Sequence, residues 1–277
     1  MTASLTAYNI VITLQNQGET SPYLNAFARF GADNIGKKII RWLPASWQLK
    51  IMAMFFVPGM SAHFVARKKL VREQAEKAIA GGIEQVVVVG AGFDTLALTL
   101  SAYYPDCRFI EMDLPSTQQQ KQKALQLAGI TQQKNVIFHP CDLSRSNFLE
   151  ELKKIPSLSN QQPVLFIFEG VLMYVPEAAV AETFRQIATL HKDTLVLFGA
   201  MAQHDSECSF LQRVLPWLVN TVGEVIYWVC PSAQMPEFLA KSGLVLREQW
   251  KYKALQKSTD PKTPEEDENY FLVAIET

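Results

Sequence analysis

Short apolar runs alternate with longer amphipathic stretches through the middle of the chain. From Gln85 onward, runs rich in valine, isoleucine, leucine and phenylalanine recur, and helical stretches separate them. Runs that are apolar throughout are typical of strands buried on both faces, as in a parallel sheet covered by helices. The pattern predicts an α/β fold with strands at residues 86–89, 108–112, 136–138, 164–168 and 195–198.

The residues before the first strand lack such runs and predict helices and connectors. Residues 21–40 and 66–80 have helical character, and Gly81-Gly82 supplies a stop for the second helix. Residues 1–82 are therefore expected to form a helical N-terminal cap.

The residues after the fifth strand predict a lid helix and two final strands. Apolar residues recur at three-to-four spacing in residues 206–229, which indicates an amphipathic helix, with Pro216 or Gly223 as a point of interruption. Proline near its start and glycine past its end predict a short helix at residues 236–241, before a strand at 244–246. Residues 260–269 are charged and predict a solvated loop, followed by a last strand at residues 270–275.

Net charge, apolar runs and cysteine spacing bear on which partners and which cellular compartment are expected. The formal net charge is −1, with 26 Lys+Arg against 27 Asp+Glu, so no overall field favours nucleic acid or an anionic membrane. No secretory pattern opens the sequence, and the apolar run at residues 51–57 is too short to span a bilayer. The cysteines are widely spaced and predict buried thiols of a reducing, cytoplasmic compartment and no metal site: Cys107, Cys141, Cys208 and Cys230.

The segment VVVVGAGFDT places a glycine turn directly after a buried strand. Gly90, Ala91 and Gly92 allow backbone N–H groups and the following helix start to approach a ligand. Asp94 stands where the pyrophosphate of a dinucleotide would lie, and Thr95 replaces the third glycine of a dinucleotide fingerprint. S-adenosylmethionine has no phosphate and carries two cationic groups, so an acidic loop favours it over a nicotinamide cofactor.

The second strand ends in two carboxylates about twenty residues beyond the glycines. Glu111 and Asp113 project to the same side of a strand, at the place where an acid binds the hydroxyls of an adenosine ribose. One of the two is expected to hold the ribose, while the other is structural or acts through water. Asp113 is favoured because it lies nearer the end of the strand.

Three further residue groups follow the third and fourth strands. Asp142 is a candidate acceptor from the adenine amino group, or a helix N-cap, and Leu143 would line the ring. Glu169, followed by Gly170, comes after five apolar residues, so its carboxylate needs a cation such as the cofactor's ammonium. Tyr174 borders the acceptor pocket or belongs to the aromatic core.

Together these strand ends resemble the leucine carboxyl methyltransferase family, including its bacterial members similar to polyketide O-methyltransferases. The matching stretches are Arg67-Lys68, VVVVGAGFDT, FIEMDLP, HPCDL and FEGVLMYVP, in order from about residue 65 to about residue 200. The resemblance implies a Rossmann-like class I methyltransferase fold, doubly wound, with about seven strands and an antiparallel last strand. It also implies that Arg67 binds the carboxylate of S-adenosylmethionine, with other contacts at Gly90, Asp113, Asp142, Leu143 and Glu169. Lys68 stands where the bacterial members commonly have threonine.

The expected protein is one domain over residues 1–277, with a cofactor-binding core at 83–200 and lid helix and final strands at 201–277. Its predicted function is S-adenosylmethionine-dependent O-methylation of a carboxylate or hydroxyl on a small-molecule or peptidyl acceptor. No catalytic base is identified, since the four histidines are scattered. A nicotinamide-dependent oxidoreductase is disfavoured by Asp94, Thr95 and the lack of a Tyr-x-x-x-Lys pair. A non-catalytic protein that binds S-adenosylmethionine, or a partner through residues 211–229, remains a further alternative.

Overall fold

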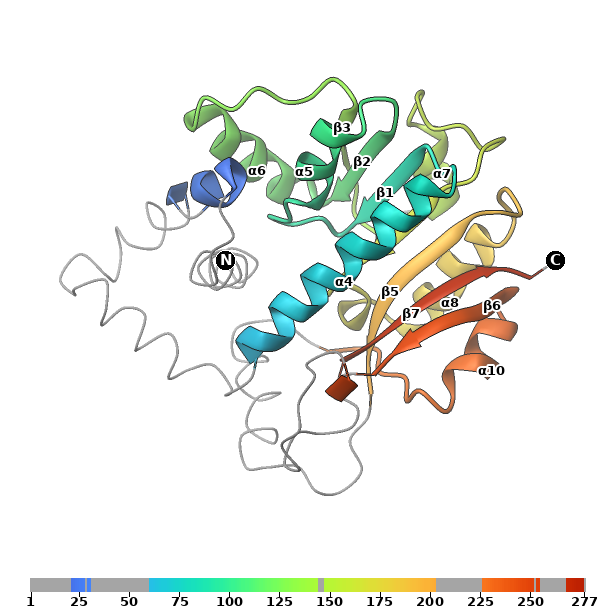
Figure 1. Cartoon of the computed structure of the whole chain (residues 1–277). Helices are drawn as coiled ribbons and strands as arrows, with labels where there is room; N and C mark the ends of the chain where they lie inside the picture. Colours follow the sequence, from blue (N-terminus) through green and yellow to red (C-terminus); the bar gives the residue numbers. More distant parts are fainter. Residues whose placement is uncertain are drawn as a thin grey trace.

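The centre of the fold is a seven-stranded sheet in the order β3-β2-β1-β4-β5-β7-β6 (Figure 1). The computed structural model describes residues 21–27, 29–30, 60–143, 147–202, 226–251, 253–254 and 268–276. Its strands are β1 (Gln85–Val89), β2 (Arg108–Asp113), β3 (Val136–Pro140), β4 (Leu165–Phe168), β5 (Leu195–Met201), β6 (Leu244–Trp250) and β7 (Glu268–Ile275). Its helices include α4 (Met60–Ala80), α5 (Leu96–Tyr103), α6 (Pro115–Leu127), α7 (Phe148–Lys153), the short 3₁₀ helix η1 (Leu172–Tyr174), α8 (Glu177–Ile187) and α10 (Met235–Ala240).

Strand direction places the candidate residues on one edge of the sheet. β1 to β5 are parallel, whereas β7 runs antiparallel to both β5 and β6, as predicted for the last strand. The strand order reverses at β1, which pairs with β2 on one side and β4 on the other. Ligands of open α/β sheets bind outside the carboxyl ends of the strands at such a reversal.

Two apolar layers confirm that the sheet is doubly wound. Val86 and Val88 of β1 belong to a core with buried residues of α4, α5 and α6, and α4 crosses in front of the sheet in Figure 1. Val87 and Val89 project to the opposite face, where they join residues of α7, α8 and α10. Every residue of β1 is buried, which explains why this strand is apolar without alternation.

The N-terminal part is described only in places. Residues 22–27 and 29–30 are helical, in agreement with the prediction for 21–40, and the rest of that range lies outside the described residues. α4 ends at Ala80, as predicted, where Gly82 adopts a positive φ of 101°. Phe27 packs edge to face on Phe93 of the glycine turn, with ring centroids 5.3 Å apart. The helical residues 22–27 therefore contact the turn that follows β1.

The predicted lid helix at 206–229 is wrong over its last four residues. Residues 226–230 have no helical structure, and the backbone N–H groups of Tyr227 and Trp228 donate instead to the carbonyl of Met173. Trp228 is buried while Tyr227 and Val229 are exposed, which is the alternation of an extended segment. Hydrogen bonds to η1 and burial of the indole thus replace helical hydrogen bonds there. Residues 203–225 lie outside the described residues.

The charged run 260–269 is not a solvated loop throughout. Glu268 and Asn269 are buried in β7 and pair with Met201 and Ala200 of β5. Asn269 Nδ2 donates to the hydroxyl of Ser232 at 3.2 Å, so its amide is satisfied within the core. Tertiary partners override the polar character of these two residues; residues 260–267 lie outside the described part.

The described cysteines agree with the prediction of buried thiols. Cys107, Cys141 and Cys230 are buried and free, and burial raises their pKa values to about 12, 12 and 11. Cys208 lies outside the described residues. Within the described ranges, no group of three or more His, Cys, Asp or Glu side chains could hold a metal ion. No described helix has both the length and the apolar character needed to cross a membrane.

Candidate cofactor-binding site

The glycine turn after β1 depends on two glycines for different reasons. Gly90 has a φ of 69°, and a Cβ added there would lie 2.5 Å from the side chain of Val171, so both backbone and space require glycine. Gly92 has a φ of 47°, but a Cβ there would meet no atom within 4 Å. Between them, Ala91 donates its N–H to the carbonyl of Met112 at 3.2 Å. The turn is thus bound to β2 and has space above Gly92.

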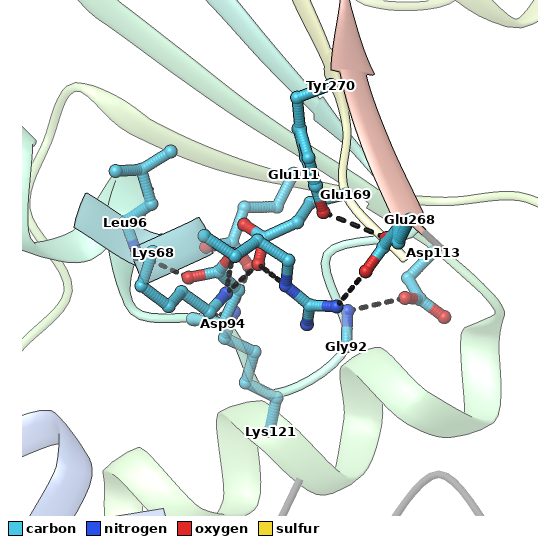
Figure 2. Close-up of polar contacts among 11 residues, drawn as sticks. Lys68, Gly92, Asp94, Leu96, Glu111, Asp113, Lys121, Glu169, Glu268 and Tyr270 are labelled. Atoms are coloured by element: carbon cyan, nitrogen blue, oxygen red, sulfur yellow. Dashed lines mark hydrogen bonds and ion pairs between the residues drawn. The ribbon is translucent and has the colours of Figure 1, made fainter. Parts of the chain in front are cut away.

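Asp113 is held on this turn by its own side chain. Its Oδ2 accepts a hydrogen bond from the backbone N–H of Gly92 at 2.6 Å (Figure 2). Its Oδ1 accepts one from the backbone N–H of Leu114, also at 2.6 Å. Each carboxylate oxygen has more than one acceptor site, so both can still accept from a ligand. The structure therefore places Asp113 beside the glycine turn, as the spacing predicts.

Glu111 lies in a buried ion pair instead. Its Oε2 is 2.5 Å from Nζ of Lys121, and Lys121 also donates to the backbone carbonyl of Asp94 at 2.5 Å. Both side chains are almost completely inaccessible to solvent. Burial raises the pKa of Glu111 to about 7, although Lys121 opposes that rise. Of the two predicted carboxylates, Glu111 is thus paired within the core and Asp113 is the more accessible one.

Asp94 is fully engaged with groups of the chain itself. Its Oδ2 lies 2.7 Å from Nζ of Lys68, and its Oδ1 accepts the backbone N–H of Leu96 at the start of α5 at 2.8 Å. Burial by itself raises the pKa of Asp94, but Lys68, Lys121 and the N–H of Leu96 outweigh it and lower the value to about 2. Asp94 therefore keeps a negative charge beside the glycine turn, where it would repel a pyrophosphate.

Glu169 is a buried carboxylate between two cations. Its side chain is 3% exposed, and its Oε1 lies 2.8 Å from Nε of Arg67 and 2.9 Å from Nζ of Lys68 (Figure 2). Neither close contact has the geometry of a hydrogen bond, and Oε2 has no partner among the described residues. Buried polar atoms are normally hydrogen-bonded, so this carboxylate retains capacity for the ammonium of a ligand.

Arg67 joins α4 to the last strand through a residue that the sequence did not reveal. Its Nη1 donates to Oε2 of Glu268 at 3.1 Å, and the hydroxyl of Tyr270 donates to Oε1 of the same glutamate at 2.9 Å. Burial by itself lowers the pKa of Arg67, but Tyr270, Glu268 and Glu169 outweigh it, so the pKa lies well above its ordinary value. Gly199 makes room for this contact, because a Cβ there would lie 2.8 Å from Glu268 Oε1.

The antiparallel direction predicted for β7 is the sequence signal that could have placed Glu268 at the site. A strand that runs antiparallel begins at the edge where the parallel strands end. The sequence pattern predicts this strand from residue 270 and places residues 260–269 in a loop, whereas β7 starts at Glu268.

The remaining predicted residues follow β3 and β4. Asp142 and Leu143 come after Cys141, whose N–H donates to the carbonyl of Asp113 at 2.8 Å and so holds this segment beside the end of β2. Gly170 has a φ of 64°, and a Cβ there would approach the Arg67 guanidinium to 3.6 Å. Tyr174 ends η1 and is about one-third exposed. Asp142, Leu143 and Gly170 therefore lie at the same edge as the network of Arg67, Asp94 and Glu169.

The balance of charge at this edge favours a cationic ligand. Three cationic side chains stand against five carboxylates in the contacts described above, namely Arg67, Lys68 and Lys121 against Asp94, Glu111, Asp113, Glu169 and Glu268. The Glu169 carboxylate accepts no hydrogen bond from the described residues, and there is open space above Gly92; together these features fit a ligand with an ammonium group and a small polar ring. S-adenosylmethionine has both.

Solved structures share this fold at low sequence identity. A candidate methyltransferase from Thermobifida fusca YX aligns with 85% of this chain and 90% of its own, with 15% identity and a TM-score of 0.62. Magnesium protoporphyrin IX methyltransferase from Synechocystis PCC 6803, solved with S-adenosylhomocysteine, covers 80% of this chain and 89% of its own, at 13% identity and a TM-score of 0.49. The first likeness confirms the predicted fold.

Other similar structures are longer than this chain. A pericyclic reaction enzyme aligns with 70% of this chain at 14% identity and a TM-score of 0.47, and the alignment spans only 43% of that enzyme. No curated protein sequence matches the chain.

A family model for leucine carboxyl methyltransferase matches residues 21–188. The matched range contains Arg67, the glycine turn and the acidic ends of β2, β3 and β4. The match covers more than half of the chain, and it confirms the family that these motifs predict. The chain belongs to the leucine carboxyl methyltransferase family.

Proposed function

We propose that this chain transfers the methyl group of S-adenosylmethionine to an oxygen atom of a carboxylate or hydroxyl on a small-molecule or peptidyl acceptor. The observation that carries the proposal is the Glu169 carboxylate, which is buried without a hydrogen bond from the described residues. It lies at the same sheet edge as Asp113, which is fixed on the glycine turn. Together the two acids suit the two polar ends of one cofactor.

The adenosine end is assigned to the residues after β1, β2 and β3. Asp113 accepts from the ribose hydroxyls, since each of its oxygens has only one backbone donor among the described residues. Gly90, Ala91 and Gly92 bring the backbone close to the ligand. Asp142 accepts from the adenine amino group, and Leu143 lies along the ring. In this assignment Glu111 supports the turn through Lys121 and does not touch the cofactor.

The amino-acid end is assigned to the residues after β4 and on α4. Glu169 accepts from the cofactor ammonium, and the Gly170 backbone lets the ligand approach. Arg67 binds the cofactor carboxylate, for which a guanidinium offers a bidentate fork. Asp94 keeps the pocket anionic through its low pKa, about 2. In this assignment, both the ammonium and the carboxylate of the amino-acid end have a partner of opposite charge.

The reaction requires little chemistry from the protein. An acceptor oxygen forms a bond to the methyl carbon as the carbon–sulfur bond breaks, and S-adenosylhomocysteine leaves with the electron pair on sulfur. A carboxylate acceptor is already deprotonated, so alignment and exclusion of water suffice, whereas a hydroxyl must also lose its proton. Tyr174 is assigned to the border of the acceptor pocket, and no residue is assigned as the base.

The proposed protein is one domain over residues 1–277, with a helical cap at 1–82, a cofactor-binding core at 83–200, and a lid and final strands at 201–277. The three buried free thiols favour a reducing, cytoplasmic setting. The near-neutral net charge of −1 gives no general attraction to nucleic acid or to anionic membranes.

Calorimetric titration with S-adenosylmethionine, S-adenosylhomocysteine and NAD tests the cofactor. We expect the two adenosyl ligands to bind and NAD not to bind, because the anionic Asp94 lies beside the turn. Transfer of a labelled methyl group to a panel of carboxylic acids, phenols and peptides with a free carboxyl terminus then tests the reaction. NAD binding in place of the adenosyl ligands would favour an oxidoreductase. Tight cofactor binding without transfer to any acceptor class would favour a non-catalytic protein.

A further inference from the structure

We infer that Lys68 sets how strongly this site binds the amino-acid end of its cofactor, because its ammonium already lies beside the carboxylate that the ligand ammonium would contact. The inference rests on the proposed function, in which Glu169 accepts from that ammonium. It makes Lys68 a specificity-determining residue that acts against the ligand charge.

The contacts of Lys68 show the competition directly. Its Nζ lies 2.9 Å from Oε1 of Glu169 and 2.7 Å from Oδ2 of Asp94 (Figure 2). Glu169 is 3% exposed, whereas Lys68 is 18% exposed. An incoming ammonium can therefore approach Glu169 only by sharing its carboxylate with Lys68 or by displacing it. Either event places two like charges together or breaks an existing ion pair, and both oppose binding.

Of the two cations beside Glu169, Lys68 is held by fewer other contacts than Arg67. Arg67 is also held by Glu268 and lies over the ring of Phe64, at 4.8 Å from its centroid. Lys68 has no aromatic contact of that kind among the described residues, and its other partner is Asp94. Asp94 keeps the backbone N–H of Leu96 at 2.8 Å if Lys68 is removed. Loss of the lysine charge thus removes one of the two cations beside Glu169, so a ligand ammonium would meet less repulsion there.

The charge count gives the direction of the effect. Two cations and three carboxylates meet here, Arg67 and Lys68 against Asp94, Glu169 and Glu268, so the formal charge is −1. Without the Lys68 charge it becomes −2, so a ligand ammonium at Glu169 would be the replacement partner, while the ligand carboxylate keeps its own cation in Arg67. A ligand without an amino-acid end gains nothing from this change.

The test compares two adenosyl ligands in matched variants. S-adenosylhomocysteine has the amino-acid end and 5'-methylthioadenosine lacks it, and both are titrated by calorimetry into the wild type, Lys68→Met, Lys68→Arg and Lys69→Met. In Lys68→Met we expect the affinity ratio of S-adenosylhomocysteine to methylthioadenosine to rise about tenfold, equivalent to about 1.4 kcal/mol. Lys68→Arg keeps the charge and should keep the wild-type ratio. Lys69 is 72% exposed and pairs only with Glu73 among the described residues, so Lys69→Met controls for loss of a helix charge.

The outcomes separate this inference from the function on which it rests. An unchanged or lower ratio in Lys68→Met, with methylthioadenosine still bound, overturns the inference and leaves the proposed function standing. An equal loss of both ligands assigns Lys68 a structural role and also overturns it. If Lys68→Met does not fold, Lys68→Gln, which keeps a donor towards Asp94, decides by the same ratio. If neither ligand binds the wild type, the proposed function fails and the inference fails with it.

Discussion

The Asp113 carboxylate accepts the backbone N–H of Gly92 at 2.6 Å, so the acid at the end of β2 is fastened to the turn that follows β1. The two residues are 21 positions apart in the sequence. Because both strands are parallel neighbours, their carboxyl ends meet at one point of the sheet edge. A ligand that binds Asp113 is thereby placed against the glycine turn.

Asp113→Ala should weaken binding of S-adenosylmethionine by about ten- to a hundredfold, since hydrogen bonds to a charged group contribute roughly 1.5–3 kcal/mol. Calorimetry on the folded variant measures the change. Asp113→Asn, which keeps one acceptor oxygen, serves as the matched control and should lose less. Unchanged affinity in Asp113→Ala would show that Asp113 does not bind the ribose hydroxyls. Glu111→Gln would then be the next variant to titrate.

Arg67→Lys should weaken the binding of S-adenosylmethionine more than the binding of 5'-methylthioadenosine. Lysine keeps the positive charge but loses the guanidinium fork, and only the first ligand has a carboxylate for that fork. The variant should also unfold at lower urea, because the contact between Arg67 and Glu268 is lost. Arg72→Lys is the control, since Arg72 lies on the same helix and pairs with Glu76 near the surface. An equal loss for both ligands would leave Arg67 a structural role alone.

Glu111 should make the free energy of unfolding fall as the pH rises from about 4.5 to about 7. Its pKa is raised in the folded protein, chiefly by burial, so in this window the folded state holds a proton that the unfolded state has lost. This contribution to the free energy of unfolding is complete below the unfolded pKa of about 4.5 and is lost as the pH rises through the folded pKa of about 7. The total change is roughly 3 kcal/mol.

Urea unfolding at several pH values measures this effect as the difference between the wild type and Glu111→Gln. The glutamine variant lacks the titrating group, so its stability should fall less over the same range. Equal slopes in the two proteins would mean that Glu111 stays ionised against Lys121 throughout.

Gly90→Ala should destabilise the protein more than Gly92→Ala. Both positions have a positive φ, which costs alanine about 1 kcal/mol, but only at position 90 does the added Cβ clash with Val171. Addition of Val171→Ala should recover part of the loss at Gly90 and none at Gly92. Thermal or urea unfolding of the single and double variants gives these differences. Equal destabilisation by the two alanine substitutions would show that Val171 moves away and accommodates the added Cβ at position 90.

The sequence indicated the parallel core and its strand-end acids because both depend on local pattern. A run such as VVVV predicts a buried strand, and a carboxylate directly after it, as at Asp113 or Glu169, must lie at the carboxyl edge. The prediction did less well where polar or apolar character was decided by distant partners. Glu268 reads as part of a charged loop, and Val229 as part of a helix, yet one is buried in β7 and the other is exposed in an extended segment.

Only the tertiary structure decided which acid has which partner. Glu111 and Asp113 are equivalent in strand periodicity, but Lys121 reaches Glu111 from α6 and the Gly92 N–H reaches Asp113 from the turn. In the same way, the sequence drew attention to Arg67 and Glu169 but not to the buried Glu268, 201 residues from Arg67. Sequence pattern is local and reports which face a residue occupies, whereas the pairing of buried charges depends on long-range packing that brings each partner within about 3 Å.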